Sequence, residues 1–214
     1  HLGTLLAVLV YYAKEILRLL GTDRRALWLL LIGTIPAVVI GLPVKIYAEH
    51  LLESPLLAGF MFPVTALILI WAARQPQGDK EYWNLRPREA AGIGLMQAFA
   101  LLPGISRSGS TIAGGLFSGL TRESAGTFAF LLAIPVIGGP GLIEVVKLIR
   151  DAGEETLTTG TPPAVLAVGA AVAFVVGYAA LWQLVQWVRR GRLAMFAWYL
   201  VPLGVGVVAW QLTK

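Results

Sequence analysis

The side chains of this sequence that could do chemistry gather between residues 97 and 115, where the chain reads QAFALLPGISRSGSTIAGG. Arg107 stands at the centre of this stretch, among hydroxyl side chains and glycines, in one of the most apolar parts of the chain. An arginine at membrane depth costs roughly 2.5 to 3.5 kcal/mol on insertion scales, and a residue retained at that cost usually has a function. Its guanidinium offers a planar fork of donors that matches phosphate oxygens. The stretch therefore predicts an anion site, most suited to phosphate, on a broken helix inside a membrane protein.

Two residues interrupt the apolar run and shape this site. Pro103 is expected to stop a first half-helix, and Gly104 permits backbone turns that other residues avoid. Ser106 and Ser108 are expected to cap a second half-helix, whose unpaired backbone N–H groups and positive dipole end then face the anion. Gly109 lets the backbone approach the ligand closely. The predicted substrate-binding residues are Gly104, Ser106, Arg107, Ser108, Gly109 and Thr111.

The same residues also have structural interpretations. Arg107 could pair with a carboxylate or with backbone carbonyls and only lock two helices together. Ser110 is as easily explained by packing as by binding. For Gln97, a hydrogen bond between helices is at least as good an explanation as a role in the site.

The composition places these residues in a membrane. The chain of 214 residues is 57% hydrophobic and 14% charged, with a mean hydropathy of +0.75, whereas soluble domains carry about 25% charged residues. We expect an all-α polytopic membrane protein with one membrane domain over residues 1–214. The net charge of +5 does not indicate nucleic acid, because the basic residues lie in loops, where they meet anionic lipid head groups. The chain has no cysteine, which excludes disulfides and thiolate metal sites.

The apolar runs predict about six transmembrane helices. Residues 2–12 form the end of one, and full spans follow at 26–47, 55–73, 124–146, 163–188 and 193–212. Before the fourth of these spans lie two short apolar pieces, 90–102 and 109–120, and neither can cross the membrane alone. They suit a re-entrant hairpin whose tip lies near mid-membrane.

The charges of the loops predict the topology. If the hairpin re-enters without crossing, 12 of the 17 Lys and Arg residues fall on one side of the membrane and 4 on the other, with Arg107 inside it. The basic side faces the cytoplasm, so the hairpin enters from there and the C-terminus lies outside. Three spans, a hairpin and three spans are also typical of inverted repeats. We expect residues 1–88 to hold the remainder of a first repeat with a connecting loop, and residues 89–214 to form the second repeat, with its hairpin at 89–120. A second hairpin, that of the first repeat, is expected in a missing N-terminal part before residue 1.

Residues 102–112 resemble the second signature of the undecaprenyl-diphosphate phosphatase family, the bacitracin-resistance integral-membrane phosphatases. That signature runs Pro-Gly-x-Ser-Arg-Ser-x-x-Thr. Flanking segments are similar as well: HLGTLLAV from His1, IPAV from Ile35 and FLLAIP from Phe130. The resemblance therefore covers essentially the whole chain. The matching signature positions are Pro103, Gly104, Ser106, Arg107, Ser108 and Thr111.

The resemblance implies hydrolysis of undecaprenyl, or another polyprenyl, diphosphate to the monophosphate and inorganic phosphate. It implies a place in the plasma membrane of a bacterium, where the reaction recycles the lipid carrier for cell-wall synthesis and confers bacitracin resistance. In the family the arginine and hydroxyls of the signature bind the diphosphate, so Arg107 and Ser106 are the predicted catalytic residues. A divalent cation, Mg²⁺ or Ca²⁺, is expected too. The family motif of paired glutamates, a serine and a histidine that is credited with metal binding and the chemical step is absent here. We therefore expect no metal ligands, and no catalytic competence, in these residues alone.

An alternative function stays open on the sequence. Broken helices, inverted repeats and a mid-membrane anion site are also features of secondary transporters and of lipid-phosphate flippases. In either case the expected partners are membrane lipids and, for the phosphatase, the polyprenyl diphosphate. Nucleic acid is not expected, and a homodimer is compatible with the sequence.

Overall fold

A computed structural model describes residues 2–151 and 163–213 of the chain. Within these ranges the regular structure is helical, apart from one isolated bridge between Lys80 and Leu120. The α-helices are α1 (Leu2–Tyr11), α2 (Ala13–Gly21), α3 (Arg24–Tyr47), α4 (Glu49–Leu52), α5 (Pro55–Ala73), α6 (Pro87–Phe99), α7 (Arg107–Phe117), α8 (Arg122–Asp151), α9 (Pro163–Arg189) and α10 (Ala197–Leu212), and 3-10 helices lie at Tyr82–Asn84 (η1) and Leu193–Phe196 (η2).

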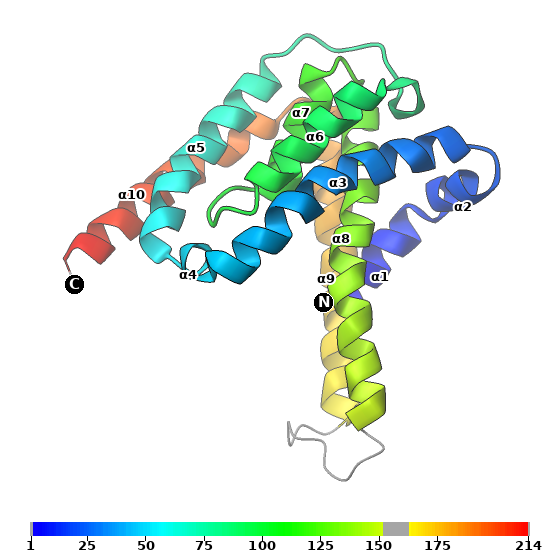
Figure 1. The fold of residues 1–214 in the computed structure, drawn as a ribbon. Helices are drawn as coiled ribbons and strands as arrows, with labels where there is room; N and C mark the ends of the chain where they lie inside the picture. The colour runs from blue at the N-terminus through cyan, green and yellow to red at the C-terminus, as the bar shows by residue number, and fades with distance from the viewer. Residues whose placement is uncertain (1, 152–162, 214) are drawn as a thin grey trace.

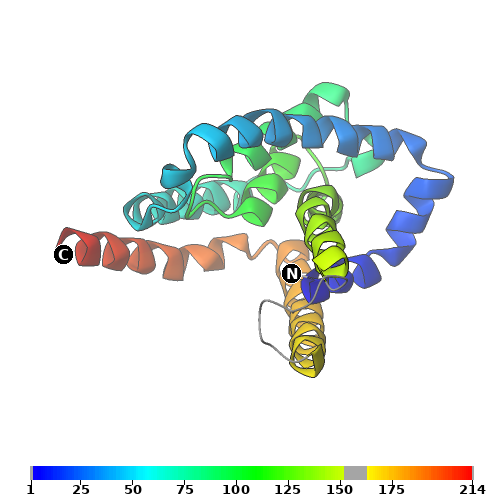
Figure 2. The same cartoon turned by 60° about the horizontal axis from the view of Figure 1, so that its bottom comes forward.

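The helices fall into two groups with the hairpin between them. α8 and α9 run side by side, and α1 packs along α9 (Figure 1). α3, α5 and α10 lie obliquely to that pair, which Figure 2 shows more nearly end-on. α6 and α7 form the hairpin: α6 packs on α3, and α7 packs on α5 and α8. The hairpin therefore has helices of both groups around it.

Four helices of the described ranges are long and apolar enough to cross a membrane: Arg24–Tyr47, Pro55–Ala73, Ala167–Arg189 and Leu193–Leu212. They coincide with four predicted spans, and the protein is an all-α multi-pass membrane protein. The two other predicted spans are not among them. Residues 2–12 form the short helix α1, and residues 124–146 lie inside α8, a helix of 30 residues with charged residues at both ends.

Glycines bring helices of the fold into backbone contact. A Cβ on Gly94 in α6 would lie 2.2 Å from the carbonyl oxygen of Gly33 in α3. A Cβ on Gly204 in α10 would lie 2.7 Å from the carbonyl oxygen of Gly59 in α5. Membrane helices approach this closely only where small residues line the contact. Larger side chains at these positions would therefore separate the hairpin from α3 and the two helices α5 and α10 from each other.

The pairing of α5 with α10 fits the predicted inverted repeats. Each helix carries a proline followed eight positions later by a tryptophan: Pro63 and Trp71 in α5, and Pro202 and Trp210 in α10. Helices that hold equivalent places in two repeats are expected to meet across the axis that relates the repeats. The repeat boundaries 1–88 and 89–214 stay a prediction.

The open end of the hairpin is closed by the loop before it. The Lys80 ammonium donates to Glu89 Oε1 at 2.8 Å and to the carbonyl oxygen of Ser118 at 3.2 Å, so one side chain bridges the start of α6 and the end of α7. The backbone N–H of Lys80 also donates to the Gly119 carbonyl oxygen, and the Lys80 carbonyl oxygen accepts from Thr121, at 3.2 and 2.9 Å. Glu89 is therefore paired with Lys80 in the first turn of α6, at the end of that helix away from the tip.

Candidate active site

The helix break lies earlier in the chain than the sequence predicts. α6 ends at Phe99 instead of Leu102, and α7 begins at Arg107 instead of Gly109. The last turn of the first half-helix tightens, with the backbone N–H of Leu101 donating to the carbonyl oxygen of Ala98 at 3.1 Å. A proline disfavours helical backbone at the residue before it, so the helix cannot continue up to Pro103 itself. Residues 100–106 thus form the tip of the hairpin.

Gly104 turns the chain at this tip, as predicted. Its φ is +87°, a conformation that glycine adopts without the steric cost borne by other residues. A Cβ at this position would lie 2.3 Å from the carbonyl oxygen of Ala58, in the first turn of α5. The position therefore requires glycine twice, for its backbone conformation and for its contact with α5.

Thr65 holds the tip in place, a role that the sequence does not predict. It lies in α5 and is 1% exposed. Its Oγ1 donates to the carbonyl oxygen of Gly104 at 2.8 Å and accepts from the backbone N–H of Ser106 at 3.2 Å. One hydroxyl thus fixes the residues on both sides of Ile105. The signal in the sequence is faint: a threonine inside an apolar run is ordinary, and its partners lie about 40 residues away in the chain.

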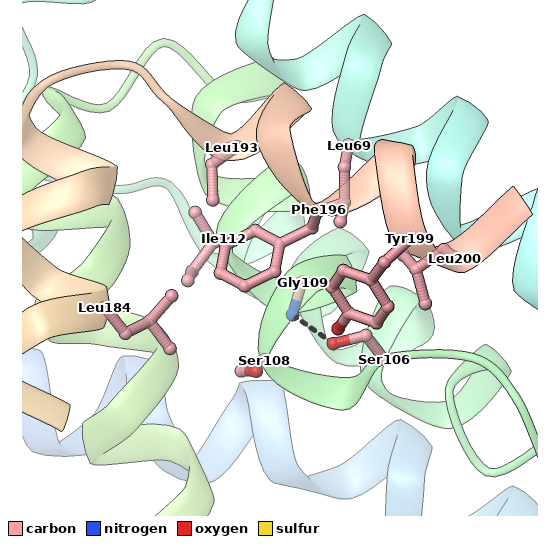
Figure 3. A pocket seen from close by; sticks show the side chains of 10 residues that line it. All are labelled: Leu69, Ser106, Ser108, Gly109, Ile112, Leu184, Leu193, Phe196, Tyr199 and Leu200. Carbon is pink, nitrogen blue, oxygen red and sulfur yellow. Dashed lines mark hydrogen bonds between the residues drawn. The ribbon is translucent and has the colours of Figure 1, made fainter. Parts of the chain in front are cut away.

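Ser106 caps α7 as predicted, and Ser108 does not. The Ser106 Oγ accepts from the backbone N–H of Gly109 at 3.1 Å, and its φ and ψ of −71° and 114° are those of a residue just before a helix (Figure 3). Ser108 lies inside the first turn of α7, because the helix begins one residue before it. The backbone N–H groups of Arg107 and Ser108 meet no acceptor in the described part of the chain. They form the open, positive end of α7, where an anion is stabilised.

The Arg107 side chain is partly buried and has no carboxylate or carbonyl partner among the described residues. The interpretation that it only locks two helices through such a partner thus finds no support in those ranges. A guanidinium that is always charged and lies away from bulk water needs an anion beside it. Arg107 is therefore free to bind one.

Residues of the signature line three cavities around the tip. Arg107, Ser108, Thr111 and Gly104 line the largest, of about 630 Å³, whose remaining wall is mainly apolar and comes from the rest of the tip and from α1, α8 and α9. Ser108 also lines a cavity of about 220 Å³ with Ser106 and Gly109, closed on its other side by α9, η2 and α10 (Figure 3). A third cavity, of about 330 Å³, lies on the α3 side of Arg107. The six predicted substrate-binding residues therefore gather around the same tip.

Thr111, Ser110 and Gln97 differ in what their polar atoms do. The Thr111 Oγ1 donates to the carbonyl oxygens of Arg107 and Ser108, at 2.9 and 3.2 Å, so its proton is engaged within α7 and only its lone pairs stay open. Ser110 and Gln97 are each 1% exposed, and their side-chain oxygen and nitrogen atoms have no hydrogen-bond partner in the described structure. The helix-to-helix hydrogen bond considered for Gln97 is thus not formed there.

The described residues do not fit a metal ion. They contain no group of three or more His, Cys, Asp or Glu side chains that could hold one. The hairpin tip presents donors, whereas Mg²⁺ and Ca²⁺ require oxygen acceptors, chiefly carboxylates.

Comparison with known proteins gives one family. The family model of the bacitracin resistance protein BacA matches residues 1–206. An undecaprenyl-diphosphatase of Rhodopirellula baltica is 47% identical over 210 residues, which cover 97% of this chain and 79% of the relative. An undecaprenyl-diphosphatase 4 of Bacillus cereus is 39% identical over 100% of this chain and 81% of its own length. An undecaprenyl-diphosphatase of Desulforudis audaxviator is 38% identical over 100% of this chain and 82% of its own length.

Proposed function

This chain belongs to the bacitracin resistance protein BacA family, and we propose on this ground and from the geometry of its hairpin that it hydrolyses undecaprenyl diphosphate. The protein is then an enzyme, a phosphatase that is also a multi-pass membrane protein. The net reaction adds water across the bridging P–O bond, and the products are the lipid monophosphate and inorganic phosphate. The observation that carries the role of the hairpin is Arg107, which has no ionic partner among the described residues and stands beside the open N-terminus of α7.

We assign the hairpin tip to the binding of the phosphoryl groups. The Arg107 guanidinium and the backbone N–H groups of Arg107 and Ser108 offer donors to the phosphate oxygens, on which negative charge concentrates. The Ser106 Oγ already accepts from Gly109, so its own proton is available to a phosphate oxygen. Donors held in place before the reaction stabilise the charge that shifts onto the leaving monophosphate. Thr65 and Gly104 keep these donors in position.

The apolar wall of the largest cavity suits the start of the lipid chain. This cavity has Arg107, Ser108 and Thr111 at one part of its wall and side chains such as Leu181 and Leu184 at another. A polyprenyl diphosphate needs polar and apolar contacts at adjacent positions, because its charged head is joined directly to a hydrocarbon chain. The arrangement supports a lipid diphosphate as substrate over a soluble one.

The divalent cation stays a proposal. In this family such an ion would offset charge on the diphosphate, but the described residues lack ligands for it.

We also propose that the C-terminus lies outside the cell. The segments at residues 22–25, 74–86 and 190–192, each at or beside a helix end, lie toward one end of the fold in Figure 1, and the C-terminus lies toward the other. All three segments carry arginines, which favours the cytoplasm for that end.

Phosphate release from undecaprenyl diphosphate tests the proposal. The full-length protein in detergent, with a divalent cation, should release inorganic phosphate, and Arg107→Ala should lower kcat/KM by roughly a hundredfold or more, because a charge-assisted donor is lost. Arg107→Lys should recover only part of this, since lysine lacks the bidentate fork. Arg88→Ala, at the exposed start of α6, is the control and should keep the wild-type rate. Normal phosphate release by Arg107→Ala would exclude the proposed role of the hairpin.

A further inference from the structure

Gln97 is a buried polar side chain of the hairpin that the site described so far leaves unused. It lies in α6, near its end, and is 1% exposed. Neither its Oε1 nor its Nε2 has a hydrogen-bond partner among the described residues. Leaving a buried polar group without a partner costs about 1 to 3 kcal/mol. A glutamine that packing alone required could be replaced by an apolar residue of the same length at no such cost.

The cavity beside Gln97 is also lined by Arg107. It has a volume of about 330 Å³ and lies between α3, the hairpin and α8, with mostly apolar residues in its wall. The other polar lining residues are Thr34 and Lys45, both of α3. The Thr34 hydroxyl donates to the carbonyl oxygen of Leu30 at 2.8 Å, so its proton is engaged inside α3. The groups left to meet a ligand are a guanidinium, an ammonium and a carboxamide.

These three groups share the ability to donate hydrogen bonds. None of the described residues that line this cavity is acidic. Arginine and lysine can only donate, and the glutamine amide nitrogen carries two N–H donors. An anion is therefore the ligand that satisfies all three, and a carboxamide beside an arginine can also accept from the guanidinium while it donates to the anion.

We propose that Gln97 is a further substrate-binding residue, whose amide donates to an oxygen of the phosphoryl group that Arg107 holds. The amide atoms are shielded from solvent in the present side-chain conformation. Rotation about the three flexible bonds of the side chain brings them to the cavity wall when the anion enters. The contact comes from the α3 side of Arg107, opposite the cavity that suits the lipid chain. This inference rests on the proposed phosphate-binding role of the hairpin.

Ser110 provides a matched control. It lies in α7 of the same hairpin, is also 1% exposed, and its Oγ also has no partner among the described residues. It lines none of the three cavities around the tip. Ser110→Ala and Gln97→Met therefore both remove an unsatisfied buried polar group from the hairpin, and only Gln97→Met removes one beside Arg107.

Ligand-induced stabilisation of the full-length protein tests the contact without catalysis. The midpoint of thermal unfolding is measured with increasing inorganic phosphate, and separately with increasing polyprenyl monophosphate, because a bound ligand stabilises the folded state by mass action. Without ligand, Gln97→Met should unfold at the wild-type temperature or higher, since it buries an apolar chain in place of an unsatisfied amide. The Kd for phosphate should rise roughly tenfold or more, as for the loss of a hydrogen bond to a charged group. If Gln97→Met binds inorganic phosphate more weakly, Gln97 contacts the terminal phosphate, which is released as inorganic phosphate. If only the polyprenyl monophosphate binds more weakly, Gln97 contacts the phosphate that stays on the lipid.

Kinetics of the same variants complete the test. Gln97→Met should lower kcat/KM for undecaprenyl diphosphate roughly 10- to 100-fold, and Gln97→Glu should lower it further, because a carboxylate repels phosphate and pairs with Arg107. Ser110→Ala should keep the wild-type Kd and kcat/KM. If Gln97→Met binds both ligands and turns over as the wild type does, the inference is overturned. If phosphate binding depends on Gln97 in a protein that does not hydrolyse the diphosphate, the hydrolysis proposal fails and this contact stands.

Discussion

Removing the Thr65 hydroxyl should disable the hairpin tip from a distance. Thr65→Val keeps the shape of the side chain and deletes two hydrogen bonds, to the Gly104 carbonyl oxygen at 2.8 Å and from the Ser106 backbone N–H at 3.2 Å. Each is worth about 0.5 to 1.5 kcal/mol net, and the two backbone groups left without a partner add to the cost. We expect a loss of about 2 to 3 kcal/mol of stability, concentrated at the tip. For a chain of this size that lowers the unfolding midpoint by about 4 to 12 °C.

Thr65→Val should also slow catalysis in the protein that stays folded. Ser106 caps α7, so a shift of its backbone moves the donors of Arg107 and Ser108 relative to the phosphate, and small displacements of such groups cost up to about a hundredfold in rate. We expect kcat to fall roughly 10- to 100-fold with little change in KM, measured as phosphate release from undecaprenyl diphosphate at a temperature where the variant is folded. Thr65→Ser keeps the hydroxyl and should retain activity within about threefold. If Thr65→Val kept the wild-type kcat while Thr65→Ser lost activity, the methyl group, and not the hydroxyl, would hold the tip.

Three further outcomes are expected. Gly104→Ala should lose folded protein or activity, because the φ of +87° disfavours a side chain and a Cβ there would lie 2.3 Å from the Ala58 carbonyl oxygen. Gly92→Ala is the control: a Cβ on Gly92 would meet nothing within 4 Å, so this variant should unfold at the wild-type temperature or about 2 to 4 °C higher. Burial alone would raise the pKa of Glu89, but the Arg86 backbone N–H and the Lys80 ammonium lower it below its usual value; the stability from these contacts is present above the unfolded-state pKa and is lost as pH falls through the lower folded-state value. Thermal unfolding between pH 5 and pH 3 should therefore show a smaller drop in midpoint for Glu89→Gln than for the wild type, and equal drops would exclude a role of this carboxylate. Chelation of divalent cations should abolish phosphate release by the full-length protein, restored by Mg²⁺ or Ca²⁺, and activity in excess chelator would refute the proposed cation.

Much of the hairpin could be predicted because its chemistry is local. The run of Pro103, Gly104 and Ser106 specifies a break, a turn and a cap within a few residues, and each feature appears in the structure close to its expected place. The predicted end of the first half-helix was wrong by a few residues, because Pro103 also disfavours helical backbone before its own position. Two serines near a helix start look alike until the first helical residue is known, so the sequence alone does not distinguish Ser106 from Ser108 as the cap.

Long-range contacts account for what the sequence could not reveal. Thr65 meets the tip only because α5 packs against α7, and no pattern near Thr65 indicates this. Whether the Gln97 amide has a hydrogen-bond partner depends on the residues that neighbour α6, and these are known only from the structure. Between two polar helices the same side chain would have found a partner. The four spans that fit the length and hydropathy of a membrane helix followed from composition alone. The place of residues 2–12 and 124–146 in the fold depends on packing that hydropathy does not describe.

The contacts of the hairpin with its neighbours also determine the depth of the site in the bilayer. Gly94 meets the backbone of Gly33 in α3, and Gly104 meets the backbone of Ala58 in α5, so the hairpin cannot slide along either helix without a clash. A segment held only by its hydrophobic length would adjust to a thinner or thicker membrane by tilting or shifting. This one is instead anchored to two spanning helices, and Arg107 moves with them as one unit. The distance from the proposed phosphate site to the lipid head groups is then a property of the protein, and the lipid diphosphate has to adapt its position to it.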